Sequence, residues 1–271
     1  MPPILLIAFQ QSVTRLTSSR DAKQLLGVIE HRNEIAAEIE FLEVSVKTLK
    51  GSAFKSIREI LCRTQNITDL VLRFSFKPIR ILPPTVVLSR LTSLDVNIAH
   101  STIVRLIQGH PHIENLALGR CTNTIRCPLT NCLLPALQSL TCPPGCVRAI
   151  AHNSPVRWLA VTYDGVQHAR FPILRLLDFR PIQTGGVLTT LHIDYNATAE
   201  RLLLRISAAA PALVYLKLTE SSSSVEVSYP LCDIAYSCAH VIHTFLRSHR
   251  CHGTIPRVGR QDCGPFHLLR G

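Results

Sequence analysis

The sequence predicts an α/β solenoid, in which each repeated unit adds one strand to a parallel sheet and one helix to its outer side. Three observations predict it. A short leucine-containing phrase recurs along most of the chain, helical periodicity fills several intervals between its copies, and proline often separates a helix from the next phrase. A strand and a helix that recur at a regular interval are typical of repeat proteins, whose units stack on their neighbours.

The recurring phrase reads apolar-x-x-Leu-x-apolar and occurs nine times. Successive copies begin 14 to 28 residues apart, mostly near the roughly 20–29 residues of leucine-rich repeats. Its last two apolar positions alternate, as a strand with one buried face requires. We therefore predict a leucine-rich-repeat solenoid of about eight or nine irregular repeats, with a parallel concave sheet and outer helices. The copies begin at Ile39, Ile67, Leu91, Ile113, Leu137, Val156, Leu174, Leu188 and Leu213.

Helices are expected in the intervals between phrases. Apolar residues precede the phrases at Ile67 and Ile113 at the same distances of 10, 7 and 6 residues, which share one helix face. Pro111, Pro155 and Pro211 then precede a phrase by one or two residues, where proline ends a helix and favours extended backbone. The alternative is a compact α/β domain with leucine-rich strands. The residues of the helix faces are Ile57, Ile60, Leu61, Ile103, Leu106, Ile107, Leu203 and Ile206.

Three regions follow from where the pattern begins and fades. Residues 1–20 are expected to be a partly ordered N-terminal segment, residues 21–229 the solenoid, and residues 230–271 an irregular tail whose composition allows disorder. The apolar start lacks a basic flank and a cleavage site, so we do not interpret it as a signal peptide. No apolar run approaches the roughly 18 residues of a membrane span, so no membrane association is expected.

Charge and cysteine content narrow the class of partner and compartment. The net charge is +11, but no Lys/Arg block exists, so nucleic acid is not the expected partner. Ten cysteines among 271 residues are fewer than in disulfide-rich secreted domains, so reduced thiols and a cytoplasmic or nuclear location are expected.

Two cysteine-containing regions could suggest a metal site. The tail carries Cys232, Cys238, His240, His243 and further His and Cys residues, without the paired short spacing of standard zinc modules. The cysteines at positions 121, 127, 132, 142 and 146 lack that spacing as well, and we interpret them as structural thiols. No nucleophile elbow, phosphate-binding loop or metalloprotease motif is present. We therefore expect no enzymatic activity, no metal and no cofactor.

The phrases "LTSLDVNIA", "GHPHIENLALGRC" and "LPALQSLTCPPG" resemble the leucine-rich repeats of fungal F-box-like proteins, over roughly residues 20–220. That resemblance implies a substrate-recognition surface of a ubiquitin-ligase receptor, in which an F-box docks on the adaptor Skp1 and the repeats select the substrate. No F-box phrase occurs here, because Leu82-Pro83-Pro84 and Leu134-Pro135-Ala136 lie inside repeats and lack the acidic residue. Skp1 is therefore not an expected partner.

The predicted function follows from the outward side chains of the strands, which form one continuous patch in a solenoid. The only tryptophan falls on this patch, and Trp, Tyr and Arg are enriched among interface hot spots. We predict a non-catalytic protein-interaction module with a protein partner that the sequence does not identify. The alternatives are a basic nucleic-acid-binding protein and a truncated gene product without retained function. The predicted binding residues are Asp95, Asn115, Trp158, Asp178, Arg180, His192, Asp194, Tyr215 and Lys217.

Overall fold

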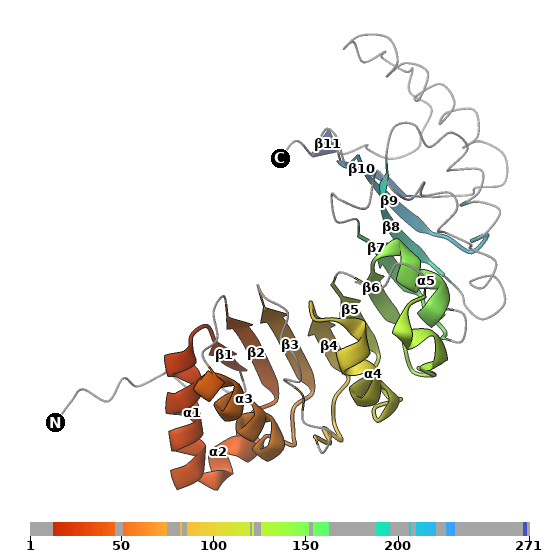
Figure 1. The fold of residues 1–271 in the computed structure, drawn as a ribbon. Coiled ribbons are helices and arrows are strands. Elements are labelled where there is room, and N and C mark those ends of the chain that lie inside the picture. The colour runs from red at the N-terminus through yellow and green to blue at the C-terminus, as the bar shows by residue number, and fades with distance from the viewer. Residues whose placement is uncertain are drawn as a thin grey trace.

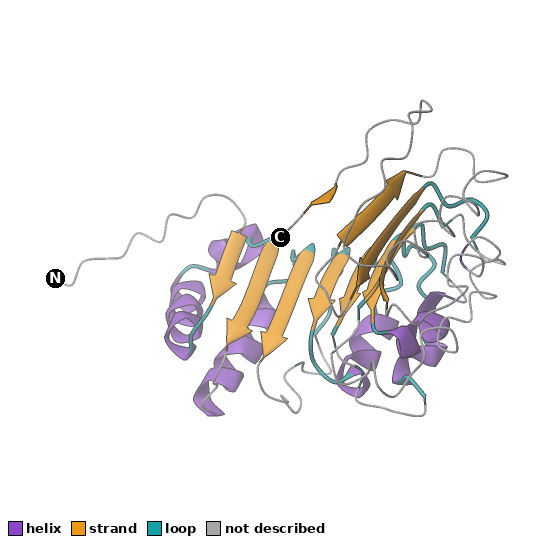
Figure 2. Cartoon of the chain, turned by 90° about the horizontal axis from the view of Figure 1, so that it is seen from above, coloured by secondary structure: helices purple, strands orange, loops and turns teal. Residues whose placement is uncertain are grey.

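A computed structural model gives the fold as one sheet with helices along one of its faces (Figures 1 and 2). It describes residues 13–46, 51–74, 82, 86–119, 121, 126–151, 154–162, 188–195, 206, 210–220, 226–230 and 268–269. In chain order the elements are β1 (Val13–Leu16), α1 (Ser19–His31), α2 (Asn33–Glu38), β2 (Phe41–Val46), α3 (Gly51–Arg63), β3 (Asp69–Phe74), β4 (Ser93–Val96), α4 (His100–Gln108), β5 (Asn115–Leu118), η1 (Pro128–Asn131), β6 (Ser139–Cys142), α5 (Pro144–Ala151), β7 (Trp158–Val161), β8 (Thr190–Tyr195), β9 (Tyr215–Glu220), β10 (Glu226–Pro230) and β11 (Leu268–Leu269).

The strands follow one another across the sheet in the order in which they occur along the chain. Strands β1 to β9 pair in parallel, and β10 and β11 add two antiparallel strands at the end. Neighbouring parallel strands need a crossover connection, because the chain must return to the same end before it forms the next strand. The predicted α/β class and the parallel sheet are confirmed.

The register of the sheet aligns the repeated phrases. In the described strands, the central leucine of a phrase pairs with the central leucine on the neighbouring strand, as in Leu94 with Leu116 and Leu140 with Leu159. These leucines face the helices and are at most 2% exposed. The predicted alternation of buried and outward strand residues is therefore confirmed. The row of central leucines comprises Leu42, Leu70, Leu94, Leu116, Leu140, Leu159, Leu191 and Leu216.

The helices cover the same face of the sheet with the residues that the periodicity predicted. All six predicted face residues of α3 and α4 are buried, and so is Ile206; Leu203 lies outside the described residues. Helix α1 begins with a capping box, in which the Ser18 hydroxyl accepts from the Asp21 backbone N–H and the Asp21 carboxylate accepts from that of Ser18. Buried His110 follows α4, where its Nδ1 contacts the Leu106 carbonyl and its Nε2 accepts the Leu88 N–H at 2.9 Å.

Several features differ from the simplest repeat. Strand β1 precedes the first phrase and extends the sheet by one strand. The crossover from β5 to β6 contains the four-residue 3-10 helix η1 as its described helical element. Strand β7 pairs directly with β8, and the phrase that begins at Leu174 lies outside the described residues. Among the helices that the structure describes, none is long and apolar enough to cross a membrane.

Candidate functional site

The sheet face opposite the helices, here called the open face, carries two adjacent rows of outward side chains. Each row runs across the strands from β2 to β9, because paired positions on neighbouring parallel strands point the same way. Most of these side chains are at least partly exposed, whereas the alternate positions are buried. The first row is Phe41, Asp69, Ser93, Asn115, Ser139, Trp158, Thr190 and Tyr215, and the second is Glu43, Val71, Asp95, Ala117, Thr141, Ala160, His192 and Lys217.

Three aromatic side chains meet on the open face over β7, β8 and β9. The ring centroids of Trp158 and His192 lie 5.0 Å apart at an interplanar angle of 69°, and those of His192 and Tyr215 lie 5.7 Å apart at 57°. The first contact is edge-to-face and the second is tilted, and edge-to-face contacts at such a distance are favourable beyond the area that they bury. Ala160, which pairs with His192, is only 8% exposed although it belongs to an outward row. We call Trp158, His192 and Tyr215 the aromatic triad.

A lysine lies next to the triad in the sheet. Lys217 pairs with His192 across β8 and β9. Burial, and then the positive charge of Lys217, lower the pKa of His192 below its ordinary value of 6.5. The imidazole is therefore neutral at pH 7. It offers the triad a ring edge and a hydrogen-bonding nitrogen without adding a second positive charge.

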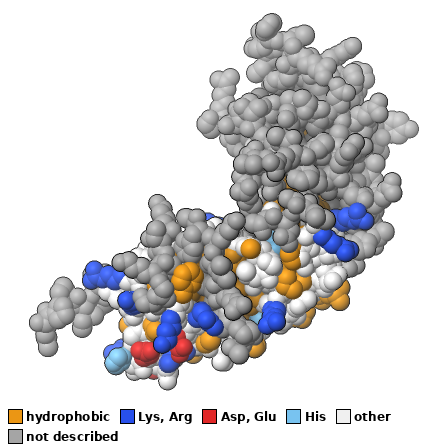
Figure 3. Space-filling view, in the orientation of Figure 1, with side chains coloured by type: hydrophobic (Ala, Val, Ile, Leu, Met, Phe, Trp, Pro, Cys, Tyr) orange, Lys and Arg blue, Asp and Glu red, His pale blue; other side chains and the backbone are white. Residues whose placement is uncertain are grey.

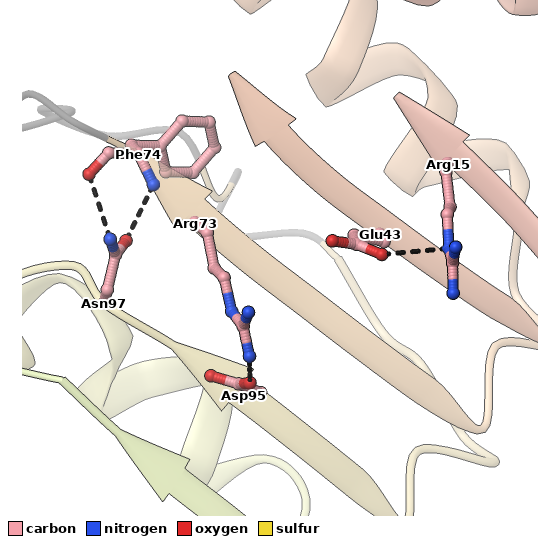
Figure 4. Close-up of polar contacts among 6 residues, drawn as sticks. All are labelled: Arg15, Glu43, Arg73, Phe74, Asp95 and Asn97. Atoms are coloured by element: carbon pink, nitrogen blue, oxygen red, sulfur yellow. Dashed lines mark hydrogen bonds and ion pairs between the residues drawn. The ribbon is translucent and has the colours of Figure 1, made fainter. Parts of the chain in front are cut away.

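The other end of the open face is polar and charge-paired (Figure 4). Arg73 on β3 donates to the carboxylate of Asp95 on β4, and Arg15 on β1 pairs with Glu43 on β2 at 3.1 Å. Both pairs are exposed enough for solvent to screen them, so we assign them an orienting role and not a large stabilising one.

Asn97, the residue directly after β4, bonds through its side chain to the last residue of the neighbouring strand β3. The side-chain oxygen of Asn97 accepts the Phe74 N–H at 2.7 Å, and its side-chain nitrogen donates to the Phe74 carbonyl at 3.0 Å (Figure 4). The amide thus supplies the two hydrogen bonds that another strand residue would supply. Gly119 lies against it, and a Cβ at Gly119 would be 2.6 Å from the Asn97 Cα. The residue at position 119, directly after β5, must therefore be very small.

The structure brings together four of the predicted binding residues and places two others, Asp95 and Asn115, elsewhere on the open face. Trp158, His192, Tyr215 and Lys217 form one group, as described above. Asp95 lies at the polar end, and Asn115 is exposed on β5 in the first row. Asp194 belongs to β8, but its side chain is outside the description. Asp178 and Arg180 lie outside the described residues.

A second group of chemically distinctive side chains lies away from the open face, and the sequence spacing did not indicate it. His100, Cys121, Cys127 and Cys146 place their ligand atoms within 4.8 Å of one another. Three of these residues were interpreted as separate structural thiols. The sequence did not single out His100, which is the first residue of α4. The remaining two cysteines of that interpretation, at positions 132 and 142, are buried outside the group.

The two groups differ in what they can do chemically. The triad offers ring area, a neutral imidazole and a nearby ammonium group, which suits recognition of another molecule's side chains. The histidine–cysteine group offers sulfur and nitrogen donors, and three of its four residues are buried. No protein-family model, curated protein or solved structure matches the chain.

Proposed function

We propose that the chain is a non-catalytic leucine-rich-repeat solenoid that binds a protein partner through the open face. The parallel sheet with strands in chain order, the aligned phrases and the helices on one face all support the solenoid. The observation that carries the function is the aromatic triad, in which rings from three successive strands meet on the face that the described helices leave uncovered.

The triad has the properties of an interface anchor. Trp158 and His192 are only partly buried, so a large aromatic and a neutral imidazole face solvent together. Tryptophan and tyrosine are enriched among residues whose truncation costs an interface more than about 2 kcal/mol. Mutual ring contacts also hold the side chains in place before binding, which lowers the entropy cost of association. We infer that the partner presents an apolar side chain to the rings.

The distribution of charge favours a protein over a nucleic acid as the partner. A phosphate backbone requires a continuous basic stripe. On the open face two arginines are already paired with the acidic residues Glu43 and Asp95. On the side of the molecule shown in Figure 3, Lys and Arg side chains lie at several separate places. The resemblance of the phrases to repeats of fungal F-box-like proteins also supports recognition of a protein substrate.

Affinity capture with three forms of the full chain tests the proposal. The forms are the wild type, Trp158→Ala in the triad and Leu133→Ala as a matched control, since Leu133 is an exposed apolar residue (64%) outside the strands. We expect a protein that the wild type and Leu133→Ala retain in equal amounts and that Trp158→Ala loses. Titration of that protein should show binding at least about 30-fold weaker for Trp158→Ala, the equivalent of about 2 kcal/mol. Equal binding by all three forms would contradict the proposal.

A further inference from the structure

The histidine–cysteine group lies where three successive crossovers leave the sheet. His100 is the first residue of α4, which follows β4, and Cys146 lies in the first turn of α5, which follows β6. Cys121 and Cys127 belong to the connection after β5, with Cys127 directly before η1. Parallel strands in chain order deliver these segments to the same edge of the sheet, so residues far apart in the sequence meet there.

The distances between the donor atoms match a tetrahedral site. Zinc bonds of roughly 2.3 Å to sulfur and roughly 2.05 Å to nitrogen, at tetrahedral angles, place a nitrogen and a sulfur ligand about 3.6 Å apart. The Nδ1 atom of His100 lies 3.4 Å from the Cys127 sulfur and 3.5 Å from the Cys146 sulfur. The whole set of four donor atoms spans no more than 4.8 Å. One ion at the centre can therefore reach every donor after small side-chain adjustments.

The second nitrogen of His100 is held in the way that a metal-bound histidine requires. Its Nε2 lies 3.3 Å from the carbonyl oxygen of Gly119. When Nδ1 binds a metal ion, the remaining ring proton lies on Nε2, where it can donate to that carbonyl. Hydrogen bonding of the distal ring nitrogen to a carbonyl or carboxylate is the usual support of a histidine ligand. The carbonyl thus fixes both the tautomer and the orientation of the ring.

The surroundings favour a closed structural site for a thiophilic ion. His100, Cys127 and Cys146 are 1%, 5% and 0% exposed and Cys121 is partly exposed, so three of the four residues have little access to water. Three sulfur donors and one imidazole exclude magnesium and calcium, which prefer oxygen, and are a standard zinc ligand set.

We propose that His100, Cys121, Cys127 and Cys146 bind one zinc ion that joins the crossovers after β4, β5 and β6. The ion would add to the packing of this region, where η1 contacts both α4 and α5 and buries Leu129 in the core. This site is independent of the open face, so either proposal can fail without the other.

Elemental analysis of the purified full chain, with a spectroscopic probe, tests the proposal. We expect about one zinc per chain in the wild type and none in Cys127→Ser. Cys132→Ser is the matched control, since Cys132 is equally buried but outside the group, and it should keep its zinc. His100→Cys should also keep zinc, because a fourth thiolate is an equivalent ligand.

Replacement of zinc by Co²⁺ in the wild-type chain keeps the test decisive even if Cys127→Ser does not fold. Tetrahedral cobalt with thiolate ligands should give strong visible bands and a sulfur-to-metal charge-transfer band, and added zinc should remove both. A wild-type chain that binds neither ion would overturn the proposal. So would zinc retained in full by Cys127→Ser, or stoichiometric iron or copper in place of zinc.

Discussion

Replacement of Leu140 by alanine should destabilise the chain far more than replacement of Trp158, although the two residues lie on adjacent strands. Leu140 is the central leucine of β6, is 0% exposed, and pairs with the leucines at 116 and 159 in the buried row. Truncation removes three buried carbons at about 0.8 kcal/mol each, or roughly 2.4 kcal/mol of transfer free energy. The cavity left behind brings the expected cost to about 2–5 kcal/mol.

Trp158→Ala acts on the opposite face of the same sheet. It removes the edge-to-face contact with His192, for which about 0.5–1.5 kcal/mol is expected beyond area burial. Partial solvent access limits the further loss, so Trp158→Ala should cost at least about 1 kcal/mol less than Leu140→Ala. Urea unfolding of both variants and the wild type, followed by far-UV circular dichroism, measures the difference. Equal costs would show that the assigned faces of the sheet are wrong.

Three further predictions concern single positions. Gly119→Ala should lower the unfolding free energy by about 1–3 kcal/mol, since the new Cβ would collide with the Asn97 backbone. Gly145→Ala should not lower it, because a Cβ there meets nothing within 4 Å, and thermal unfolding compares the two variants. Ser18→Ala should lower the unfolding free energy by about 1 kcal/mol, and Ser18→Gly by only a few tenths, in urea titrations. Because folding lowers the pKa of His192, the unfolded chain binds its proton more readily. The unfolding free energy should therefore fall as pH falls through 6.5 and level off below the folded pKa, and His192→Gln should lack this part of the pH dependence.

Much of the sheet could be predicted because the same phrase specifies strand, face and register. A leucine flanked by an anchor three residues earlier and an apolar residue two later has one consistent placement, and a one-residue slip would expose the whole buried row. Strand β1 was not predicted because its four residues, VTRL, lack the phrase and its burial depends on pairing with β2. The helix capping box at Ser18 was likewise visible in the sequence only as a serine before an acidic residue.

The two candidate sites also differ in how far the sequence predicted them. Alternation placed Trp158, His192 and Tyr215 on one face, but not the ring contacts, which depend on the pairing of β7 directly with β8. The histidine–cysteine group was missed for a physical reason. Its ligands are separated by 20, 5 and 18 residues, because each crossover supplies one or two of them. Spacing rules derived from short zinc loops do not apply to a site assembled from neighbouring repeats.

Site-specific photo-crosslinking in cells tests most directly whether the open face binds a protein. A benzophenone amino acid replaces Ser139, which pairs with Trp158 in the first row and is partly exposed, or Leu133, which is 64% exposed outside the strands. We predict a discrete adduct with another protein from position 139 and none from position 133, and loss of the adduct when Trp158→Ala is added. An adduct from position 133 alone, or one from position 139 that survives Trp158→Ala, would contradict this prediction.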